Sequence, residues 1–354
     1  MIQTTRPPVK IGIVGLGRAG LEMHCKELAK YPELFKIVAV CDTIKDRRDM
    51  VRETNPECRS YRRYRDMIED PDVELVDIAT RSDSHCENAV NALKASKWVN
   101  LERPICSDHE EALVLRATAV KASNRLLVRQ NYRYEPAFVK VQEIIDSGLL
   151  GDIYNVTMRR GKYIRRDDWQ AVKRCSGGVT LAEGTAFLDQ ALVLLRTPPA
   201  KVWADLKRVA AVGDAEDYMH ILLSNQAGMT IDIKYSGGRI SDDPLFRVSG
   251  SKGEFVLYEG ADKGHIKYQN PDVNLPRRRA SVRTPSLGSF GTPEEIDWIE
   301  KDVALDTEEE CGMDYIWVHV FKAIRENINY PITLESAVDV MRILSIIKKD
   351  SAFA

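Results

Sequence analysis

Short apolar runs alternate with longer amphipathic segments in the first third of the chain. The runs are rich in β-branched residues and predict strands, and the segments between them have the spacing of helices. We expect strands at 9–14, 35–41, 73–79, 98–101 and 126–130, and helices at 21–31, 46–53, 64–69, 87–95 and 110–123. Strands that alternate with helices favour an α/β fold whose parallel sheet is covered on both faces.

The pattern changes after Asn131. Beyond one helix, short apolar runs follow one another with turns between them, which is typical of an antiparallel or mixed sheet. We expect strands at 153–159, 202–209, 219–224, 229–235 and 254–258, and helices at 138–147, 181–195, 315–327 and 334–349. Residues 270–312 are polar and rich in proline and arginine, so a long loop or arm is expected there.

The first predicted strand meets a turn with three glycines, in the sequence VKIGIVGLGRAG. Strand, glycine turn and helix form the context in which G-x-G-x-x-G binds a dinucleotide. Gly15 would make the tight turn, Gly17 would let a pyrophosphate approach the backbone, and Gly20 would let the helix close onto the strand. The second strand ends at Asp42, where a carboxylate can accept a hydrogen bond from an adenosine ribose. The sequence therefore predicts a dinucleotide-binding Rossmann domain.

Composition narrows the possible partners. The 354 residues are 44% hydrophobic and 29% charged, with a formal net charge of -2, so no global field attracts nucleic acid or an anionic membrane. The N-terminus is short and polar, and no apolar stretch of transmembrane length is expected, which predicts a cytoplasmic protein. The seven cysteines have no zinc-like spacing, which predicts reduced thiols and no metal site.

Several longer segments resemble one family of proteins. They are VDIATRSDSHCENAVNALKASKWVNLERP, QNYRYEPAFVKVQEIIDSGLLGDI and YPITLESAVDVMRILSIIKKDSA. Together with the glycine turn and Asp42, they are similar to the glucose-fructose oxidoreductase and inositol dehydrogenase (Gfo/Idh/MocA) family over nearly the whole chain. The resemblance implies an NAD-binding Rossmann domain at 1–131, with a C-terminal helix at 333–354 packing back on it. It also implies an α+β substrate-binding and oligomerisation domain at 132–332, with a large, mostly antiparallel open sheet.

The resemblance further implies a nicotinamide cofactor and a carbohydrate-like substrate. Carried over from the family's motifs, the cofactor-binding residues are Gly15, Gly17, Arg18, Ala19, Asp42, Thr80, Ser82, His85, Glu102 and Arg103. Asp42 favours NAD, because a carboxylate repels the 2′-phosphate of NADP. Lys45, Arg47 and Arg48 leave some room for NADP.

Three positions depart from the family's catalytic pattern. The lysine of its Glu-Lys-Pro turn is Arg103, and the aspartate and histidine positions of SGGVTLAEGTAFLDQ are Ala182 and Ala186. Arg103 can polarise a substrate oxygen, but arginine stays protonated and cannot accept a proton. Glu183 is the nearest ionisable side chain, although on a regular helix it would lie about 100° round from Ala182. We predict Arg103 and Glu183 as the catalytic residues.

The charged segment RRGKYIRRDDWQAVKR lies next to the expected pocket. We predict that Lys162, Tyr163, Trp169 and Lys173 contact the substrate, with Trp169 as an apolar platform for a sugar ring and the cations as partners of an acidic sugar or phosphate. A solvent-facing role is the alternative for each. Lys162, Tyr163 and Lys173 also remain alternatives to Glu183 as the proton acceptor, because general bases are recognised by geometry.

The leading hypothesis is a cytoplasmic NAD-dependent oxidoreductase that acts on a sugar, polyol or sugar acid with atypical catalytic residues. One alternative is an NAD-binding sensor or regulator that has lost turnover. Another is an enzyme that uses bound NAD transiently for elimination or bond cleavage. The few helices near the large predicted sheet can cover only one of its faces, so a homo-oligomer, either dimer or tetramer, is expected to cover the other.

Overall fold

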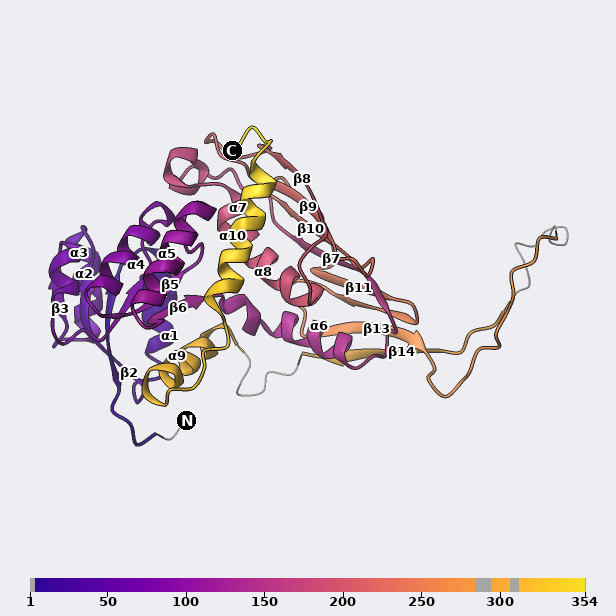
Figure 1. Ribbon diagram of the computed structural model, residues 1–354, viewed down its shortest axis with the longest axis horizontal. Helices are drawn as coiled ribbons and strands as arrows, with labels where there is room; N and C mark the ends of the chain where they lie inside the picture. Colours follow the sequence, from indigo (N-terminus) through magenta and orange to yellow (C-terminus); the bar gives the residue numbers. More distant parts are fainter. Residues whose placement is uncertain (1–3, 284–293, 306–311, 354) are drawn as a thin grey trace.

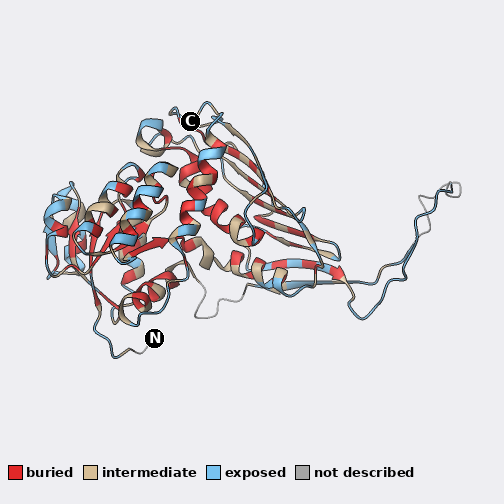
Figure 2. Ribbon diagram, viewed as in Figure 1, coloured by how far each residue is buried: buried red, intermediate tan, exposed pale blue. Residues whose placement is uncertain are grey.

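The computed structural model describes residues 4–283, 294–305 and 312–353. These residues form two β-sheets, and several helices lie between the sheets (Figure 1). Buried residues are concentrated in the strands and in the helix faces turned toward them (Figure 2). The arrangement confirms the predicted combination of a Rossmann fold with a second, mostly antiparallel sheet.

Within the described residues, the first sheet has six parallel strands in the order β3-β2-β1-β4-β5-β6. The strands are β1 (Val9–Val14), β2 (Phe35–Cys41), β3 (Arg59–Tyr61), β4 (Leu75–Ile78), β5 (Trp98–Glu102) and β6 (Leu126–Arg129). The helices around them are a π-helical segment (Arg18–Cys25), α1 (Lys26–Leu28), α2 (Lys45–Thr54), α3 (Tyr64–Ile68), α4 (His85–Lys94) and α5 (His109–Lys121). Successive strands are added on one side of β1 up to β3 and on its other side from β4 onward, so β1 and β4 flank the topological switch point. Ligands bind at such switch points, beyond the carboxyl ends of the strands.

The second sheet has eight described strands in the order β14-β13-β12-β11-β7-β10-β9-β8. Their bounds are β7 (Ile153–Arg160), β8 (Lys201–Lys207), β9 (Tyr218–Ser224), β10 (Thr230–Ser236), β11 (Phe246–Gly250), β12 (Gly253–Leu257), β13 (Lys263–Gln269) and β14 (Trp298–Ala304). β7 and β10 run parallel, and the other neighbours run antiparallel. The remaining helices are α6 (Pro136–Asp146), α7 (Val179–Ala182), α8 (Gly184–Leu195), α9 (Ile316–Arg325) and α10 (Leu334–Lys348).

Four strands were not expected from the sequence. β3 and β11 are short, and β13 alternates exposed Lys263, His265 and Lys267 with buried positions instead of forming an apolar run. β14 lies inside 270–312, where only a loop or arm was expected. It pairs with β13 at the sheet edge, and most of its residues are exposed, including the charged Glu300, Lys301 and Asp302. Two parts of that expected arm, 284–293 and 306–311, lie outside the described residues.

Helix α10 connects the two halves of the molecule, and α9 packs on the first sheet. α10 packs against α5 of the first half and α8 of the second, and Figure 1 shows it running between the two sheets. In α9, Trp317 packs edge-on against Phe35 of β2, with ring centroids 5.5 Å apart. The end of the chain therefore completes the cover of the first sheet.

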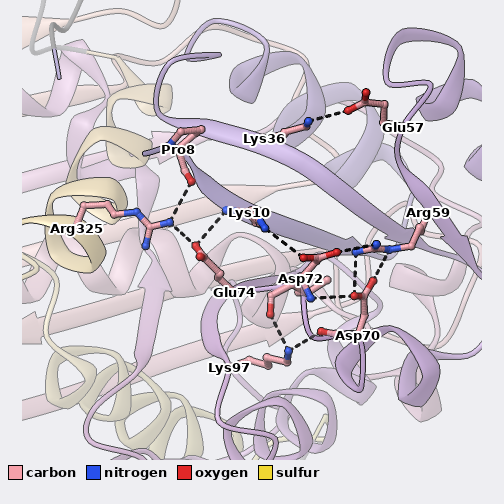
Figure 3. Close-up of polar contacts among 11 residues, drawn as sticks. Pro8, Lys10, Lys36, Glu57, Arg59, Asp70, Asp72, Glu74, Lys97 and Arg325 are labelled. Atoms are coloured by element: carbon pink, nitrogen blue, oxygen red, sulfur yellow. Dashed lines mark hydrogen bonds and ion pairs between the residues drawn. The ribbon is translucent and has the colours of Figure 1, made fainter. Parts of the chain in front are cut away.

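An ion-pair network holds α9 at the end of the first sheet where β1 begins (Figure 3). The Arg325 guanidinium pairs with Glu74 and donates to the backbone oxygens of Pro7 and Pro8. Nearby, Arg59 pairs with Asp70 and Asp72. This end lies opposite the carboxyl ends of the strands, so the network stabilises the fold outside the expected ligand site.

One sequence-based expectation needs correction. The helical segment Lys173–Leu195 is long and apolar enough to cross a membrane by length and composition, although no such stretch was expected. In the fold, 78% of its most apolar window is buried inside the protein. Its apolar character is explained by its position as a core helix between the two sheets.

Candidate functional site

A cavity of about 840 Å³ lies at the carboxyl ends of the first sheet's strands and extends to the end of α7 and to Glu183. Most of the predicted site residues line it. These are Gly15, Gly17, Arg18, Ala19, Asp42, Thr80, Ser82, His85, Glu102, Arg103, Trp169 and Glu183. Lys162, Tyr163 and Lys173 are not among its lining residues in the described part of the chain. The fold thus brings the predicted cofactor residues together and separates three of the predicted substrate residues from them.

The glycine turn has the geometry that close backbone packing requires. Gly15 has a φ of +87°, and a Cβ there would lie 2.6 Å from the Ala79 oxygen. A Cβ on Gly20 would lie 2.1 Å from the Gly15 oxygen, whereas a Cβ on Gly17 would meet no atom within 4 Å. Gly15 and Gly20 are therefore needed by the protein itself, and Gly17 leaves open space beside the backbone. A pyrophosphate group fits such a turn, which leads directly into the helical segment Arg18–Cys25.

The far end of the cavity combines a carboxylate with cations. Asp42 accepts hydrogen bonds from the backbone N–H groups of Leu16 and Ile44, both at 2.8 Å, and its side chain is 8% exposed. The Arg47 guanidinium lies 3.6 Å from the same carboxylate, and Arg62 also lines this region. Each carboxylate oxygen can accept a second hydrogen bond, so Asp42 can still receive a ribose hydroxyl.

His85 joins the loops that follow β4 and β5. Its Nδ1 lies 2.6 Å from the Pro104 oxygen, and its Nε2 lies 3.0 Å from the Thr80 oxygen. The ring is almost fully buried. His85 therefore fixes the spacing of the two loops that carry Thr80 and Arg103 at the cavity.

A buried charge network that the sequence analysis missed supports Glu102 from behind. His24 lies 2.7 Å from Asp77 through Nδ1 and 3.2 Å from Glu102 through Nε2, and the Arg129 Nε lies 3.2 Å from Glu102. Burial alone and the charge of Arg129 would lower the pKa of His24, but the charge and hydrogen bond of Asp77, with the hydrogen bond of Glu102, together raise this pKa to about 9. Burial alone would raise the pKa of Glu102, but the hydrogen bond and charge of His24, with Arg129, lower it to about 2. Glu102 is thus held as an anion at the cavity wall.

A signal for this network is present in the sequence. Asp77, Asn100 and Arg129 are fully buried polar residues inside predicted strands that are mostly apolar, VELVDIA, WVNLE and LLVRQ. A charged residue in a fully buried strand needs a partner, so such interruptions point to a buried polar cluster.

The helix expected at 181–195 is broken, and the break positions Glu183. α7 ends at Ala182, α8 begins at Gly184, and Glu183 between them has φ and ψ of -116° and -37°. Ala182 and Glu183 both line the cavity, although on a regular helix they would lie about 100° apart. Ala186 is buried within α8 and is not one of the described residues that line the cavity.

Arg103 lies between Glu183 and the nucleotide half of the cavity. It donates through Nη1 to the Ala182 oxygen, and its guanidinium carbon lies 4.8 Å from the centre of the Tyr132 ring. Burial alone would lower the pKa of Arg103, but the negative charges of Glu183 and Glu102 outweigh it and raise the pKa. Arg103 is therefore a permanent cation beside a carboxylate.

The segment 161–175 reaches the cavity through different residues than expected. Trp169 lines it, and the Arg81 guanidinium carbon lies 5.5 Å from the Trp169 ring centre. Arg166, Asp168 and Gln170 line the cavity too, and Arg166 pairs with Asp168 at 2.8 Å. Tyr163 is 59% exposed at the surface, Lys162 is also exposed, and Lys173 faces a second cavity.

No metal site accompanies these groups. Across the residues that the structure describes, no cluster of three or more histidine, cysteine, aspartate or glutamate side chains is arranged to hold a metal ion. The six cysteines within those ranges are free, and Cys311 lies outside them.

Comparison with known proteins agrees with this geometry, which is that of a dinucleotide-binding oxidoreductase. Residues 9–130 match the model of an oxidoreductase family with an NAD-binding Rossmann fold, and residues 138–256 match the GFO/IDH/MocA C-terminal domain. The chain therefore belongs to the Gfo/Idh/MocA family of oxidoreductases.

Individual relatives are more distant. Over 347 residues, the chain is 25% identical to scyllo-inositol 2-dehydrogenase (NADP(+)) IolW of Bacillus subtilis (strain 168), covering 95% of this chain and 92% of that protein. It is 33% identical over 145 residues to inositol 2-dehydrogenase of Salmonella typhimurium, covering 40% and 43% of the two chains. An NAD-binding protein from Listeria innocua has the same fold, with a TM-score of 0.82 and 22% identity over 97% of each chain.

Proposed function

We propose that the protein is an NAD(P)-dependent oxidoreductase in which Glu183 transfers the proton and Arg103 polarises the substrate oxygen. The substrate proposed is a sugar, polyol or sugar acid. The observation that carries this proposal is the helix break that brings Glu183 to the cavity beside Arg103. The family's aspartate and histidine positions are Ala182 and Ala186, so a carboxylate from the adjacent position would take over the proton transfer.

The two residues suit the two parts of an alcohol oxidation. A bound nicotinamide would take the hydride from the carbon that bears the hydroxyl group. Glu183 would accept the hydroxyl proton, because its carboxylate borders the same cavity. Arg103 would stabilise the negative charge that develops on the oxygen without giving up its own proton. In the reverse reaction, Glu183 would return the proton to the carbonyl oxygen.

The residues present fit a dinucleotide cofactor. Gly17, Arg18 and Ala19 would hold the pyrophosphate, and Asp42 would bind the adenosine ribose. Thr80, Ser82, His85, Glu102 and Arg103 would flank the nicotinamide half. We propose a preference for NAD because of Asp42. NADP remains the alternative, since Arg47 and Arg62 lie nearby and the Bacillus subtilis relative is named for NADP(+).

The substrate class is proposed from two observations. Two relatives are named as inositol dehydrogenases, which favours a polyol. Trp169 lines the cavity with the Arg81 guanidinium over its ring, and Arg166 lines the same cavity, so an aromatic surface and cations are available to a sugar or sugar acid. We propose a cytoplasmic enzyme with a cofactor domain at 1–131, a substrate domain at 132–332 and the helix at 333–354 returning to the first.

We also propose a homo-oligomer that covers the outer face of the second sheet. Trp203 on β8 and Trp298 on β14 are 50% and 44% exposed there, and Trp203 packs edge-on against His220 of β9. Another copy of the same sheet would bury these rings. Light scattering that finds only monomers at all accessible concentrations would contradict this arrangement.

The functional test is a screen of polyols, sugars and sugar acids for NAD or NADP reduction, followed by Glu183→Gln on any substrate found. Loss of a general acid or base lowers kcat by roughly 10²-fold to 10⁴-fold, and that loss is expected here. Glu335→Gln, at an exposed position on α10, is the matched control and should leave the rate unchanged. An unchanged rate in Glu183→Gln would remove this role.

Cofactor binding without turnover of any carbohydrate would favour a sensor or regulator instead. In that case, the double change Ala182→Asp with Ala186→His should create activity if only the proton-transfer groups have been lost. Release of a cleaved or dehydrated product without net cofactor reduction would favour transient use of NAD.

A further inference from the structure

A second cavity, of about 370 Å³, lies on the other side of α7 from the candidate active site. Leu181 of α7 lines this second cavity, and the next residue, Ala182, lines the first. Four parts of the chain line it: the loop after β5, the segment 173–181, Glu216 just before β9, and the end of α10 with the turn that follows it. The proposed function does not use this space.

The buried carboxylate of Glu216 lies between the second cavity and a smaller one of about 40 Å³, and one of its oxygens is unpaired in the described part of the chain. Glu216 is 2% exposed, and its Oε1 accepts hydrogen bonds from the hydroxyl and the backbone N–H of Thr180. Within the described residues, Oε2 of Glu216 has no hydrogen-bond partner. Burial raises the pKa of the Glu216 carboxyl, as expected for an acid with too few donors. A buried polar atom without a partner is costly, and a ligand that supplies one would remove that cost.

Cations also line the cavity. Lys348 and Lys349 at the end of α10 both line it, and the Lys348 Nζ lies 3.9 Å from Oε1 of Glu216. Lys173 holds the C-terminal turn at its edge, because its Nζ donates to the Ala352 oxygen and lies 4.8 Å from the centre of the Phe353 ring. Asp108 also lines the cavity, but its carboxylate accepts a hydrogen bond from the backbone N–H of Glu111 at the start of α5. The cavity therefore combines three lysines with this capping carboxylate and the buried acceptor Glu216.

We propose that this cavity is a second ligand site for a small hydroxylated anion, such as a sugar acid or a sugar phosphate. A ligand hydroxyl donates to Oε2 of Glu216, and the anionic group binds Lys348 and Lys349. A neutral polyol lacks the group that the lysines recognise, and an anion without a hydroxyl leaves Glu216 unpaired.

This ligand would be sensed at the active site. Glu216 binds Thr180 in the first turn of α7, and α7 ends at Ala182, whose oxygen accepts a hydrogen bond from Arg103. A ligand that shifts Glu216 therefore moves the helix that positions Arg103 and Glu183. This coupling rests on the proposed function, whereas the binding site does not.

The experiment is isothermal titration of the intact protein, saturated with NADH or NADPH, whichever binds more tightly. The probes are D-gluconate, D-glucose 6-phosphate, inorganic phosphate and uncharged D-sorbitol. We expect one equivalent of gluconate or glucose 6-phosphate to bind, with sorbitol and phosphate at least tenfold weaker. Whichever of the two anions binds more tightly shows whether the site prefers a carboxylate or a phosphate group.

Variants locate the binding. Because hydrogen bonds to charged groups are strong, the double change Lys348→Gln with Lys349→Gln should lower the affinity for the anion roughly tenfold to a hundredfold. Glu216→Gln should also weaken it, and Lys121→Gln, exposed at the other end of α5, should not. If Glu216→Gln fails to fold, the double lysine variant decides the question.

Several results would overturn the site. They are the absence of binding by either hydroxylated anion, equal affinity for sorbitol, or an affinity that the double lysine change leaves unaltered. Loss of binding in Arg103→Met but not in the lysine variant would assign the anion to the first cavity. If Glu183→Gln keeps its rate while the anion still binds through the lysines, the proposed function fails and the second site stands.

Discussion

The two ends of the candidate active site are built in different ways. The nucleotide end consists largely of backbone, in the turns after β1 and β4, where Gly15 and Gly20 leave no room for a side chain. The substrate end consists of side chains that meet from distant stretches, with Arg103 after β5, Trp169 in a long connection and Glu183 between α7 and α8. A backbone site tolerates little change, whereas a side-chain site can lose its usual residues and recruit neighbours.

The largest expected effect tests the network on which both ends rest. His24→Leu removes the cation between Asp77 and Glu102 and leaves both carboxylates buried without it. The free energy of unfolding should therefore fall by about 3–5 kcal/mol. Chemical denaturation measures this loss. Arg65→Leu, which removes an exposed cation paired with Glu69 at the end of α3, should lower the free energy of unfolding by less than about 1 kcal/mol. Equal losses would mean that the buried network has no special role.

The same histidine predicts a pH dependence. The pKa of His24 is raised from 6.5 to about 9, so the folded state binds the proton more tightly than the unfolded state. This stabilisation is complete below pH 6.5 and is lost as the pH rises through about 9. Denaturation curves measured between pH 6.5 and about 9 should show the free energy of unfolding fall in the native protein and not in His24→Leu. A decline of the same size in the variant would assign it to other groups.

The next effect concerns the substrate end alone. Arg103→Met removes the charge that would stabilise the substrate oxygen, and kcat/KM on an established substrate should fall by roughly 10²-fold to 10³-fold. Arg103→Lys restores the family's residue and should retain more activity than Arg103→Met. Cofactor affinity, measured by quenching of protein fluorescence, should change far less than the rate. If only the cofactor affinity fell, Arg103 would be assigned to cofactor binding instead of to the substrate.

A smaller effect separates packing from binding at the nucleotide end. Gly20→Ala places a methyl group against the Gly15 oxygen and should destabilise the fold by about 1–3 kcal/mol, as overpacking does. Gly17→Ala adds its methyl group to open space and should leave the thermal midpoint of unfolding nearly unchanged. It should lower the affinity for the cofactor, because the methyl group occupies the space proposed for the pyrophosphate. The opposite pattern, a destabilised Gly17→Ala with normal cofactor binding, would contradict the proposed approach of the pyrophosphate.

The smallest expected effect concerns the choice of cofactor. Titration with NAD(H) and NADP(H) should show tighter binding of NAD(H), and Asp42→Ala should narrow the difference by about tenfold, as expected for one lost polar contact. Arg62→Gln should lower the affinity for NADP(H) and leave the affinity for NAD(H) unchanged. Equal or reversed affinities in the native protein would remove the ribose assignment of Asp42.

The same contrast explains what the sequence could predict. The first sheet follows from apolar runs that alternate with helices, and its glycine turn is a local pattern, so both were predictable. β13 and β14 carry charged residues on their exposed faces and escaped an apolar criterion. The break at Glu183 depends on how α7 meets Glu216 and Arg103, residues far away in the sequence. Helical periodicity alone could not reveal it.

The packing of α9 on the first sheet has a consequence for biosynthesis. Phe35 of β2 contacts Trp317 and Phe321, and the Arg129 guanidinium carbon lies 5.0 Å from the centre of the Trp317 ring. A ribosome makes residue 35 long before residue 317, so the nascent sheet keeps an apolar surface exposed until α9 has emerged. Such an exposed intermediate is a natural client for chaperones, and fragments that stop before α9 should aggregate.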